Sequence, residues 1–306
     1  MRARFGAALG GAILIAVLAT AARAQEKDLD TPYVQTPQNV VDKMLEIAKV
    51  GHDDYVIDLG SGDGRMVITA AARYGARGFG VDLDRRLVNL ANRNAAKAGV
   101  AKRAVFYERD LFDTDVSQAT VLTLYLLPDV NLAIRARLLA TLKPGTRIVS
   151  HDYDFGDWPP DLQLEMPAPG KKVGARQVSK VFYWVVPGLA AGKWRWQLRR
   201  DGKTEEYELT LDQNFQKLGG ALLAGGRVAK LENLALVGEQ LSFSAMVTTG
   251  AGTVRQEYSG RISHHAMDGT VRVLRGDQPG DRPEQLTWSA AQTEIRDPRH
   301  FSQTSP

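Results

Sequence analysis

Residues 55–65 read Tyr-Val-Ile-Asp-Leu-Gly-Ser-Gly-Asp-Gly-Arg, and this stretch decides the fold. The apolar run 55–59 predicts a short buried strand, and residues 66–74 follow with helical spacing. Between the two, glycines let the backbone turn sharply and approach a ligand closely. A strand, a glycine loop and a helix in this order indicate a binding loop, although a glycine loop alone is equally consistent with a tight turn.

The sequence on both sides of this loop alternates between helix and strand. Thr36 is a candidate N-cap, Pro37 suits the first helical position, and Gly51 ends that helix. The remaining segments are expected as strands at 78–82, 104–108, 119–125, 147–151 and 178–186, and as helices at 85–98 and 130–142. Such alternation predicts an α/β fold with a Rossmann-like, mostly parallel sheet and helices on both faces.

The pattern changes to a period of two after Pro187. Residues 194–200 alternate aromatic or apolar with polar side chains, and Asp201-Gly202 forms a predicted hairpin turn. Further short β runs at 204–211, 219–223, 240–247, 253–262 and 270–274 are separated by glycine-containing turns. They predict a small antiparallel all-β domain, either a barrel or a sandwich.

The N-terminal segment has the features of an export signal. Arg2 and Arg4 precede an uncharged, mostly apolar run over 5–22, and Ala22-Arg23-Ala24 is an A-x-A cleavage site. The alternative is an uncleaved anchor, since this run is close to spanning length, with the α/β domain held on the cytoplasmic face. We expect cleavage, and therefore an exported, periplasmic protein with no stable membrane span.

These patterns divide the chain into four parts. We expect a signal peptide at 1–24, an α/β domain at 25–187, a small β domain at 188–292 and a flexible tail at 293–306.

Charge and composition exclude several classes of function. The 306 residues contain 39 Lys and Arg against 35 Asp and Glu, a net charge of +4. Because residues 1–24 hold three Arg and no acid, the remainder has 36 against 35, or +1, so we expect no nucleic-acid partner. The chain has no Cys, which excludes a Cys nucleophile and thiolate metal sites, and the five His lack a metal-binding spacing, so no metal is expected.

Acidic residues occur at the ends of three successive predicted strands: Asp58, Asp82 and Asp110. The carboxyl ends of parallel strands meet at one edge of the sheet, where open α/β sheets bind ligands. There Asp82 can accept hydrogen bonds from ribose hydroxyls, and Asp110 can accept from an adenine amino group beside Leu111. Each acid alone would also be consistent with a helix cap or a surface charge.

The glycine spacing and the charges indicate which nucleoside ligand fits. A dinucleotide fingerprint is G-x-G-x-x-G, but here the third glycine comes one residue early, and no P-loop motif is present. Asp58 and Asp63 would repel a pyrophosphate, whereas acids suit a cationic ligand. S-adenosyl-L-methionine carries a sulfonium, an ammonium, a ribose and an adenine without phosphate, and is therefore the expected cofactor.

Several motifs together resemble a known family, the class I S-adenosylmethionine-dependent methyltransferases. More narrowly, the chain resembles the subgroup with the mitochondrial lysine methyltransferases of the adenine nucleotide translocase and the ATP synthase c subunit, and their bacterial exported relatives. The motifs that carry this resemblance are Tyr33–Pro37, Asp58–Arg65, Gly80–Asp82, Asp110, Tyr125–Pro128 and Arg147–Ser150. It covers residues 33–186, and the β domain is not part of the mitochondrial pattern.

The resemblance implies the cofactor roles of individual residues. A loop at the methionine end of the cofactor would be formed by Asp58, Gly60, Gly62 and Gly64. Tyr33 and Thr36 would form a lid, Asp82 would bind the ribose, and Asp110 with Leu111 the adenine.

The resemblance also implies methyl transfer by in-line displacement, with a protein lysine side chain as the favoured acceptor. Tyr125 would lie beside the methyl group, and any general base would be His151 or Asp152, residues that are equally consistent with a polar strand end. The alternative is a non-catalytic exported binding module with a vestigial cofactor site.

Overall fold

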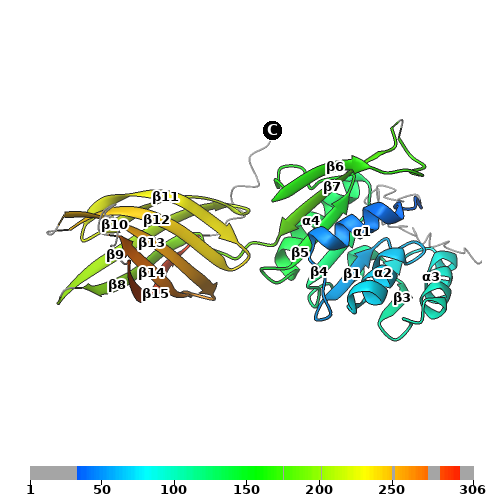
Figure 1. Cartoon of the computed structure of the whole chain (residues 1–306), viewed down its shortest axis with the longest axis horizontal. Helices are drawn as coiled ribbons and strands as arrows, with labels where there is room; N and C mark the ends of the chain where they lie inside the picture. The colour runs from blue at the N-terminus through cyan, green and yellow to red at the C-terminus, as the bar shows by residue number, and fades with distance from the viewer. Residues whose placement is uncertain (1–32, 175, 201, 250–251, 275–282, 297–306) are drawn as a thin grey trace, which may run out of the picture. The chain divides into compact units, whose positions relative to one another are not determined.

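The computed structural model describes residues 33–296, except 175, 201, 250–251 and 275–282 (Figure 1). The predicted signal peptide and residues 297–306 of the predicted tail lie outside the described residues. The last strand continues to Ile295, so the predicted domain end at residue 292 falls inside a strand.

The first folded part is a seven-stranded sheet with the strand order β3-β2-β1-β4-β5-β7-β6. Its first five strands are mutually parallel, and β7 runs antiparallel to both β5 and β6. The strands are β1 (Tyr55–Leu59), β2 (Arg77–Asp82), β3 (Ala104–Glu108), β4 (Val121–Leu124), β5 (Arg147–His151), β6 (Leu162–Pro167) and β7 (Val178–Val185). The sequence analysis missed β6, because this edge strand is largely exposed and has no apolar run.

Four α-helices and a short 3-10 helix connect these strands: α1 (Gln38–Ile47), α2 (Arg65–Tyr74), α3 (Arg85–Lys97), η1 (Leu111–Asp113) and α4 (Pro128–Thr141). From β1 to β3 the chain moves one way across the sheet, and from β4 to β5 it moves the other way. Since parallel crossovers are right-handed, α2 and α3 cover one face and α4 the other. Two apolar clusters, built around Met44 and Phe106, hold α1, α2 and α3 to the sheet. The predicted Rossmann-like fold is thus confirmed.

The strand order reverses between β1 and β4, which lie side by side. Folds of this kind bind their ligands at the carboxyl edge of the sheet beside such a reversal. The glycine loop, Gly60–Gly64, follows β1 at this edge, and Tyr125 follows β4. The hairpin between β6 and β7 turns at the same edge, because Val181 at the start of β7 pairs with His151 at the end of β5.

One predicted local feature is wrong. Thr36 does not cap α1; Pro37 occupies the N-cap position, and no side chain accepts a hydrogen bond there. The Thr36 hydroxyl instead lies 3.1 Å from Nδ1 of His151, because the segment before α1 crosses the carboxyl ends of the strands.

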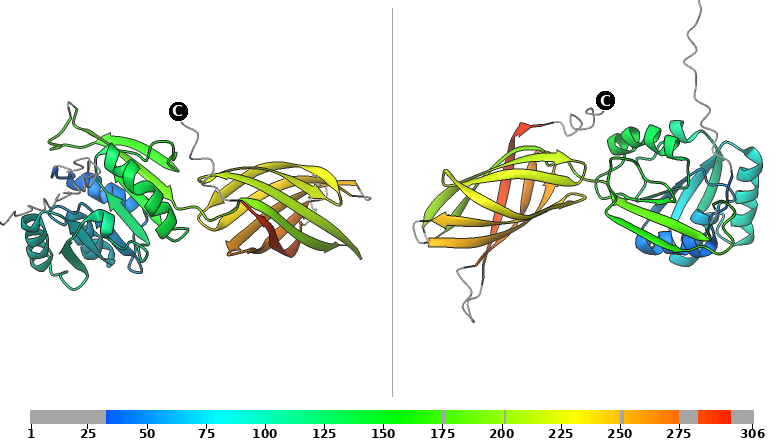
Figure 2. Two further views of the ribbon diagram at one scale, coloured as in Figure 1. Left: turned by 180° about the vertical axis from the view of Figure 1, so that it is seen from behind. Right: turned by 90° about the horizontal axis from the view of Figure 1, so that it is seen from above.

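The second folded part is a closed antiparallel barrel with the strand order β10-β11-β12-β13-β14-β15-β8-β9 (Figure 2). Its strands are β8 (Gly192–Arg200), β9 (Lys203–Asn214), β10 (Lys217–Ala224), β11 (Arg227–Val237), β12 (Gln240–Thr249), β13 (Gly252–Ser263), β14 (Ala266–Leu274) and β15 (Glu284–Ile295). The antiparallel all-β domain is confirmed, and of the two predicted forms it is a barrel. Strands β11 and β15 were missed; both are interrupted by bulges, and both alternate weakly between apolar and polar side chains.

Side chains of the barrel interior form an apolar core of their own. Trp194, Trp196 and Leu198 on β8 are buried, as their alternation predicts, and Arg195 between them is exposed. All members of this core cluster come from residues 190–290. None of the helices in the described part of the chain is long and apolar enough to cross a membrane.

Candidate functional site

The glycine loop is built from backbone conformations that favour glycine. Gly60, Gly62 and Gly64 have φ values of 74°, 53° and 82°. The Gly60 and Ser61 amides donate to the Val81 carbonyl of β2, so the loop folds back over the sheet. A Cβ at Gly62 would lie 2.5 Å from Cε2 of Tyr33. The Tyr33 ring therefore packs against the loop at Gly62, and its role as a lid over the cofactor stays a prediction.

Asp58 lies buried beneath this loop on β1. Its Oδ1 accepts a hydrogen bond of 2.7 Å from the Thr123 hydroxyl on the neighbouring strand β4. Burial raises the pKa of Asp58 to about 7, although the bond from Thr123 acts in the opposite direction. A cationic group placed next to Asp58 would favour the ionised form, so this carboxyl is suited to bind an ammonium.

Asp82 and Asp110 end up at the same edge as Asp58. Asp82 Oδ2 accepts from the Gly62 amide at 2.9 Å, which ties β2 to the glycine loop. Asp110 Oδ1 accepts from the Phe112 amide at 2.8 Å and caps η1, with Leu111 half-buried beside it. Asp82 thus orders the loops on both sides of it with two oxygens, since its Oδ1 accepts from the Asp84 amide at 2.9 Å, whereas Asp110 orders its own loop with Oδ1.

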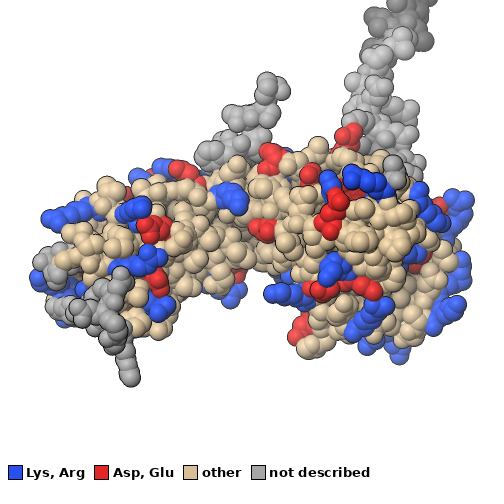
Figure 3. All heavy atoms as spheres, turned by 45° about the horizontal axis from the view of Figure 1, so that its top comes forward, with Lys and Arg blue, Asp and Glu red and all other residues tan. Residues whose placement is uncertain are grey.

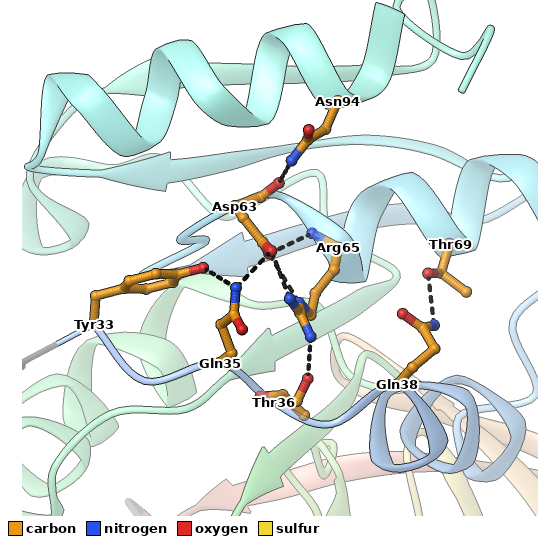
Figure 4. A network of polar contacts seen from close by, with 8 residues as sticks. All are labelled: Tyr33, Gln35, Thr36, Gln38, Asp63, Arg65, Thr69 and Asn94. Carbon is orange, nitrogen blue, oxygen red and sulfur yellow. Dashed lines mark hydrogen bonds and ion pairs between the residues drawn. The ribbon is translucent and has the colours of Figure 1, made fainter. Parts of the chain in front are cut away.

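The segment before α1 is attached to the glycine loop by hydrogen bonds to the Asp63–Arg65 ion pair (Figure 4). Arg65 donates to both carboxylate oxygens of Asp63, at 2.9 and 2.6 Å, and to the Thr36 carbonyl at 2.7 Å. Gln35 donates to Asp63 at 3.4 Å and to the Tyr33 hydroxyl at 3.0 Å. The sequence analysis considered Asp63 only as a charge that disfavours pyrophosphate. In the structure it binds Arg65 and Gln35 and so connects the glycine loop to the segment before α1.

The three predicted catalytic residues meet at the ends of β4 and β5. The Tyr125 hydroxyl donates to Oδ2 of Asp152 at 3.1 Å, and the Tyr125 ring lies 4.0 Å from the ring of His151. His151 is fully buried, with Nδ1 3.1 Å from the Thr36 hydroxyl and Nε2 2.7 Å from the Ser179 hydroxyl. Both nitrogens are thus engaged, and burial lowers the pKa of His151 to about 4, against a smaller opposing effect of Asp152.

The residues present fit S-adenosylmethionine. Three glycines in left-handed conformations form the loop at the carboxyl edge, and Asp58 provides a buried carboxyl beneath it. Asp58, Asp82 and Asp110 stand on β1, β2 and the segment after β3, in the order in which the methionine, ribose and adenine parts would follow. In the described part of the chain, no cluster of three potential metal-ligating side chains occurs.

Charges on the face shown in Figure 3 are of both signs and interspersed. This distribution agrees with the balance of 36 basic and 35 acidic residues after residue 24.

Three functional residues escaped the sequence analysis. Thr123 holds Asp58, Arg65 holds Asp63, and Lys171 lies 2.7 Å from Oδ2 of Asp152. Arg65 is part of the quoted motif, so its position beside Asp63 offered a signal. Lys171 offered none, because 19 residues of sequence separate it from its partner and only the β6–β7 hairpin brings the two together.

Comparison with known proteins identifies the family. The family model described as the ANTKMT methyltransferase domain matches residues 58–162. A protein-lysine N-methyltransferase from Saccharolobus islandicus is 46% identical over 130 residues, which cover 42% of this chain and 81% of that protein. The chain belongs to the ANTKMT methyltransferase family. It is therefore an S-adenosylmethionine-dependent methyltransferase, as the motifs predicted.

Other relatives of this methyltransferase align with it over different shares of their own length. The adenine nucleotide translocase lysine N-methyltransferase of Mus musculus is 32% identical over 43% of this chain and 57% of its own length. A crystal structure of an RNA methyltransferase from Salinibacter ruber with S-adenosyl-L-homocysteine aligns over 50% of this chain and 93% of that one, at 49% identity and a TM-score of 0.46.

Proposed function

We propose that this methyltransferase transfers methyl groups to the side-chain nitrogen of lysine in a protein acceptor. The observation that carries the proposal is its 46% identity to the archaeal protein-lysine N-methyltransferase, 81% of which it covers. Relatives that modify the adenine nucleotide translocase and the ATP synthase c subunit point to the same acceptor class.

The arrangement around Tyr125 suits a neutral amine. The rings of Tyr125 and Tyr153 are stacked with centroids 6.2 Å apart, beside the strand ends. An amine enclosed by aromatic rings loses hydration, which lowers its pKa and favours the unprotonated, nucleophilic form. Alignment of two reactants in one site contributes about 7–11 kcal/mol, so this mechanism requires no dedicated general base.

Each residue of the cofactor site would bind a different part of the cofactor and so align it with the acceptor. Bound S-adenosylmethionine would supply the methyl group and a sulfur leaving group. Asp58 would hold the ammonium of the methionine end, Asp82 the ribose and Asp110 the adenine. Tyr33 would cover the glycine loop from outside, and Tyr125 would face the reacting carbon.

An acceptor assay tests the proposal. Cell extracts from a strain that lacks the gene are incubated with the purified protein and methyl-labelled S-adenosylmethionine, and aliquots are then treated with protease or ribonuclease. We expect protease-sensitive label that is recovered as methyl-lysine after hydrolysis. Ribonuclease-sensitive label would instead favour the acceptor class of the Salinibacter ruber protein, and no label would favour a non-catalytic binding module.

Two substitutions make this assay specific. Tyr125→Phe removes the hydroxyl next to the expected acceptor and should reduce labelling at least tenfold, with S-adenosylhomocysteine affinity unchanged. Tyr183→Phe is the matched control, because this tyrosine packs with the α1 cluster instead of the strand ends, and its labelling should equal that of the wild type.

We also propose that residues 1–24 direct export. The support is the order of positive charge, apolar run and A-x-A site in the sequence. N-terminal sequencing of the native protein after cell fractionation tests it: a periplasmic chain that starts at Gln25 is expected. A chain that starts at Met1 in the membrane fraction would favour the uncleaved anchor.

A further inference from the structure

Asp152 is held in a left-handed backbone conformation by its neighbours. Its φ is 64°, a region that residues other than glycine seldom adopt, although Asp does so more readily than most. Two hydrogen bonds to β7 hold it there: its amide donates to the Lys180 carbonyl at 2.8 Å, and its Oδ1 accepts from the Lys180 amide at 3.0 Å. A doubly anchored carboxylate at the end of β5 indicates a function for its remaining oxygen.

That remaining oxygen, Oδ2, lies 3.5 Å from Nε2 of His151 and has two nearer partners. Lys171 places its ammonium 2.7 Å away, and the Tyr125 hydroxyl lies at 3.1 Å. The Lys171 ammonium also donates to the Val178 carbonyl at 2.7 Å, and only 9% of its side chain is exposed. With an ion pair and a second hydrogen bond, Lys171 is a fixed part of the site, and an incoming acceptor has little means to displace it.

This arrangement determines which way the Tyr125 hydroxyl points. Burial would raise the pKa of Asp152, but the bond from the Lys171 ammonium and the bond from the Lys180 amide hold it below its usual value. An ionised carboxylate only accepts hydrogen bonds, so Tyr125 must donate its hydrogen to Asp152. The lone pairs of the Tyr125 oxygen are then the only groups that this hydroxyl can offer to a substrate.

We infer that Lys171 is a positioning residue for methyl transfer: through Asp152 it commits the Tyr125 hydroxyl to accept a hydrogen bond from the acceptor nitrogen. An amine whose N–H points to Tyr125 directs its lone pair elsewhere, toward the methyl carbon. The nitrogen–carbon bond then forms as the carbon–sulfur bond breaks, its electron pair stays on sulfur as a thioether, and the surplus proton leaves the nitrogen for water. This inference rests on the proposed function.

Substitution of Lys171 tests the inference, with the assay on gene-deletion extract and labelled S-adenosylmethionine as the readout. Lys171→Met should lower kcat about 30-fold and leave the S-adenosylhomocysteine affinity within twofold. Lys171→Arg keeps a cation beside Asp152 and should restore kcat to within about fivefold of the wild type. The control is Lys172→Met at the exposed neighbouring position, which should behave as the wild type.

The pH profile separates positioning from a merely structural role. Without the Lys171 cation, the pKa of Asp152 rises because burial is no longer opposed by that partner. A protonated Asp152 can itself donate to Tyr125. At saturating cofactor, the Lys171→Met kcat should therefore fall at low pH beyond the fall that acceptor protonation causes in the wild type, as a new acid limb. His151 also faces Asp152, with Nε2 3.5 Å from Oδ2, and is neutral above its pKa of about 4. The neighbours of His151 on the segment before α1 and on β7 are the neutral hydroxyls of Thr36 and Ser179.

Each result of these measurements either supports or overturns the positioning role of Lys171. A Lys171→Met kcat within threefold of the wild type, a rise in kcat, or a loss without the new acid limb overturns the inference while the proposed function stands. A wild-type protein that labels no acceptor overturns both. If Lys171→Met loses cofactor binding, Lys171→Gln replaces it, because the amide keeps a donor to Val178 without the charge, and the same criteria apply.

Discussion

At the scale of single residues, the buried carboxyl of Asp58 links the charge of the site to its ligand. It lies under the glycine loop with one hydroxyl partner, and its pKa of about 7 means that it is partly protonated at neutral pH before a cation arrives. The pKa falls when an ammonium binds beside it, so proton release and cofactor binding are coupled.

We therefore predict that S-adenosylhomocysteine affinity rises with pH up to about 7 and levels off above 8. Below the pKa of free Asp58, each pH unit should weaken binding by up to about tenfold, because a proton must first leave. Calorimetric titration in two buffers of different ionisation enthalpy measures the affinity and the released proton. Asp58→Asn should bind more weakly without this pH dependence, and a wild-type affinity independent of pH would contradict the assignment.

Arg65 provides a second prediction at this scale. Its side chain is 25% exposed and joins Asp63 to the Thr36 carbonyl, so Arg65→Met should free the segment over the glycine loop. We expect at least a tenfold loss of S-adenosylhomocysteine affinity by calorimetry. The control is Arg73→Met, on the same helix as Arg65, which breaks a more exposed ion pair with Asp42 of α1. It should change affinity less than twofold and stability by about 0–1 kcal/mol. Equal effects of the two substitutions would contradict this role.

At the scale of elements, the loop between β1 and α2 depends on glycine for two separate reasons. Gly62 combines a left-handed backbone with the Tyr33 ring at 2.5 Å from an added Cβ. Gly99, at the end of α3, has a φ of 72° and open space around it. A residue with a side chain would therefore be strained by the left-handed backbone at both positions, but only at Gly62 would it also collide with a neighbouring ring.

We predict that Gly62→Ala and Gly99→Ala both lower the free energy of unfolding, by about 1–2 kcal/mol from the left-handed conformation. Only Gly62→Ala should also weaken S-adenosylhomocysteine binding, by tenfold or more, because the Tyr33 ring must move away. Denaturant titration and calorimetry on both variants measure the two effects. Unchanged binding in Gly62→Ala would show that Tyr33 does not cover the cofactor loop.

Most elements of the α/β domain could be predicted from sequence, because buried parallel strands are short apolar runs next to glycine or helix signals. Strands β1, β3 and β5 have the predicted bounds. The failures have a common cause: β6, β11 and β15 are edge, bulged or half-exposed strands whose stability comes from pairing with neighbours. Local patterning contains little of that information.

At the scale of the whole molecule, the chain combines a methyltransferase domain with a barrel that has its own interior. The barrel core consists of residues from 190–290 alone, and β15 pairs with β8 to close it. The family model matches residues 58–162, so it does not extend into the barrel.

We predict that the barrel folds by itself. A fragment of residues 188–296 should give a β-rich circular dichroism spectrum and a single cooperative thermal transition, since a closed barrel with an aromatic core leaves no edge unpaired. The fragment should not bind S-adenosylhomocysteine. A non-cooperative or aggregated fragment would show that the barrel needs the α/β domain.

The sequence by itself determined the fold class, the cofactor and the family, because glycines and acids at strand ends are local patterns with one chemical explanation. It also placed Asp58, Asp82 and Asp110 at a common edge, since parallel strands align their carboxyl ends. Only the tertiary structure decided that Thr36 turns to His151 instead of capping α1, and that Lys171 reaches Asp152. These contacts join residues far apart in sequence, and their partners are selected by the packing of the hairpin and the helix against the sheet.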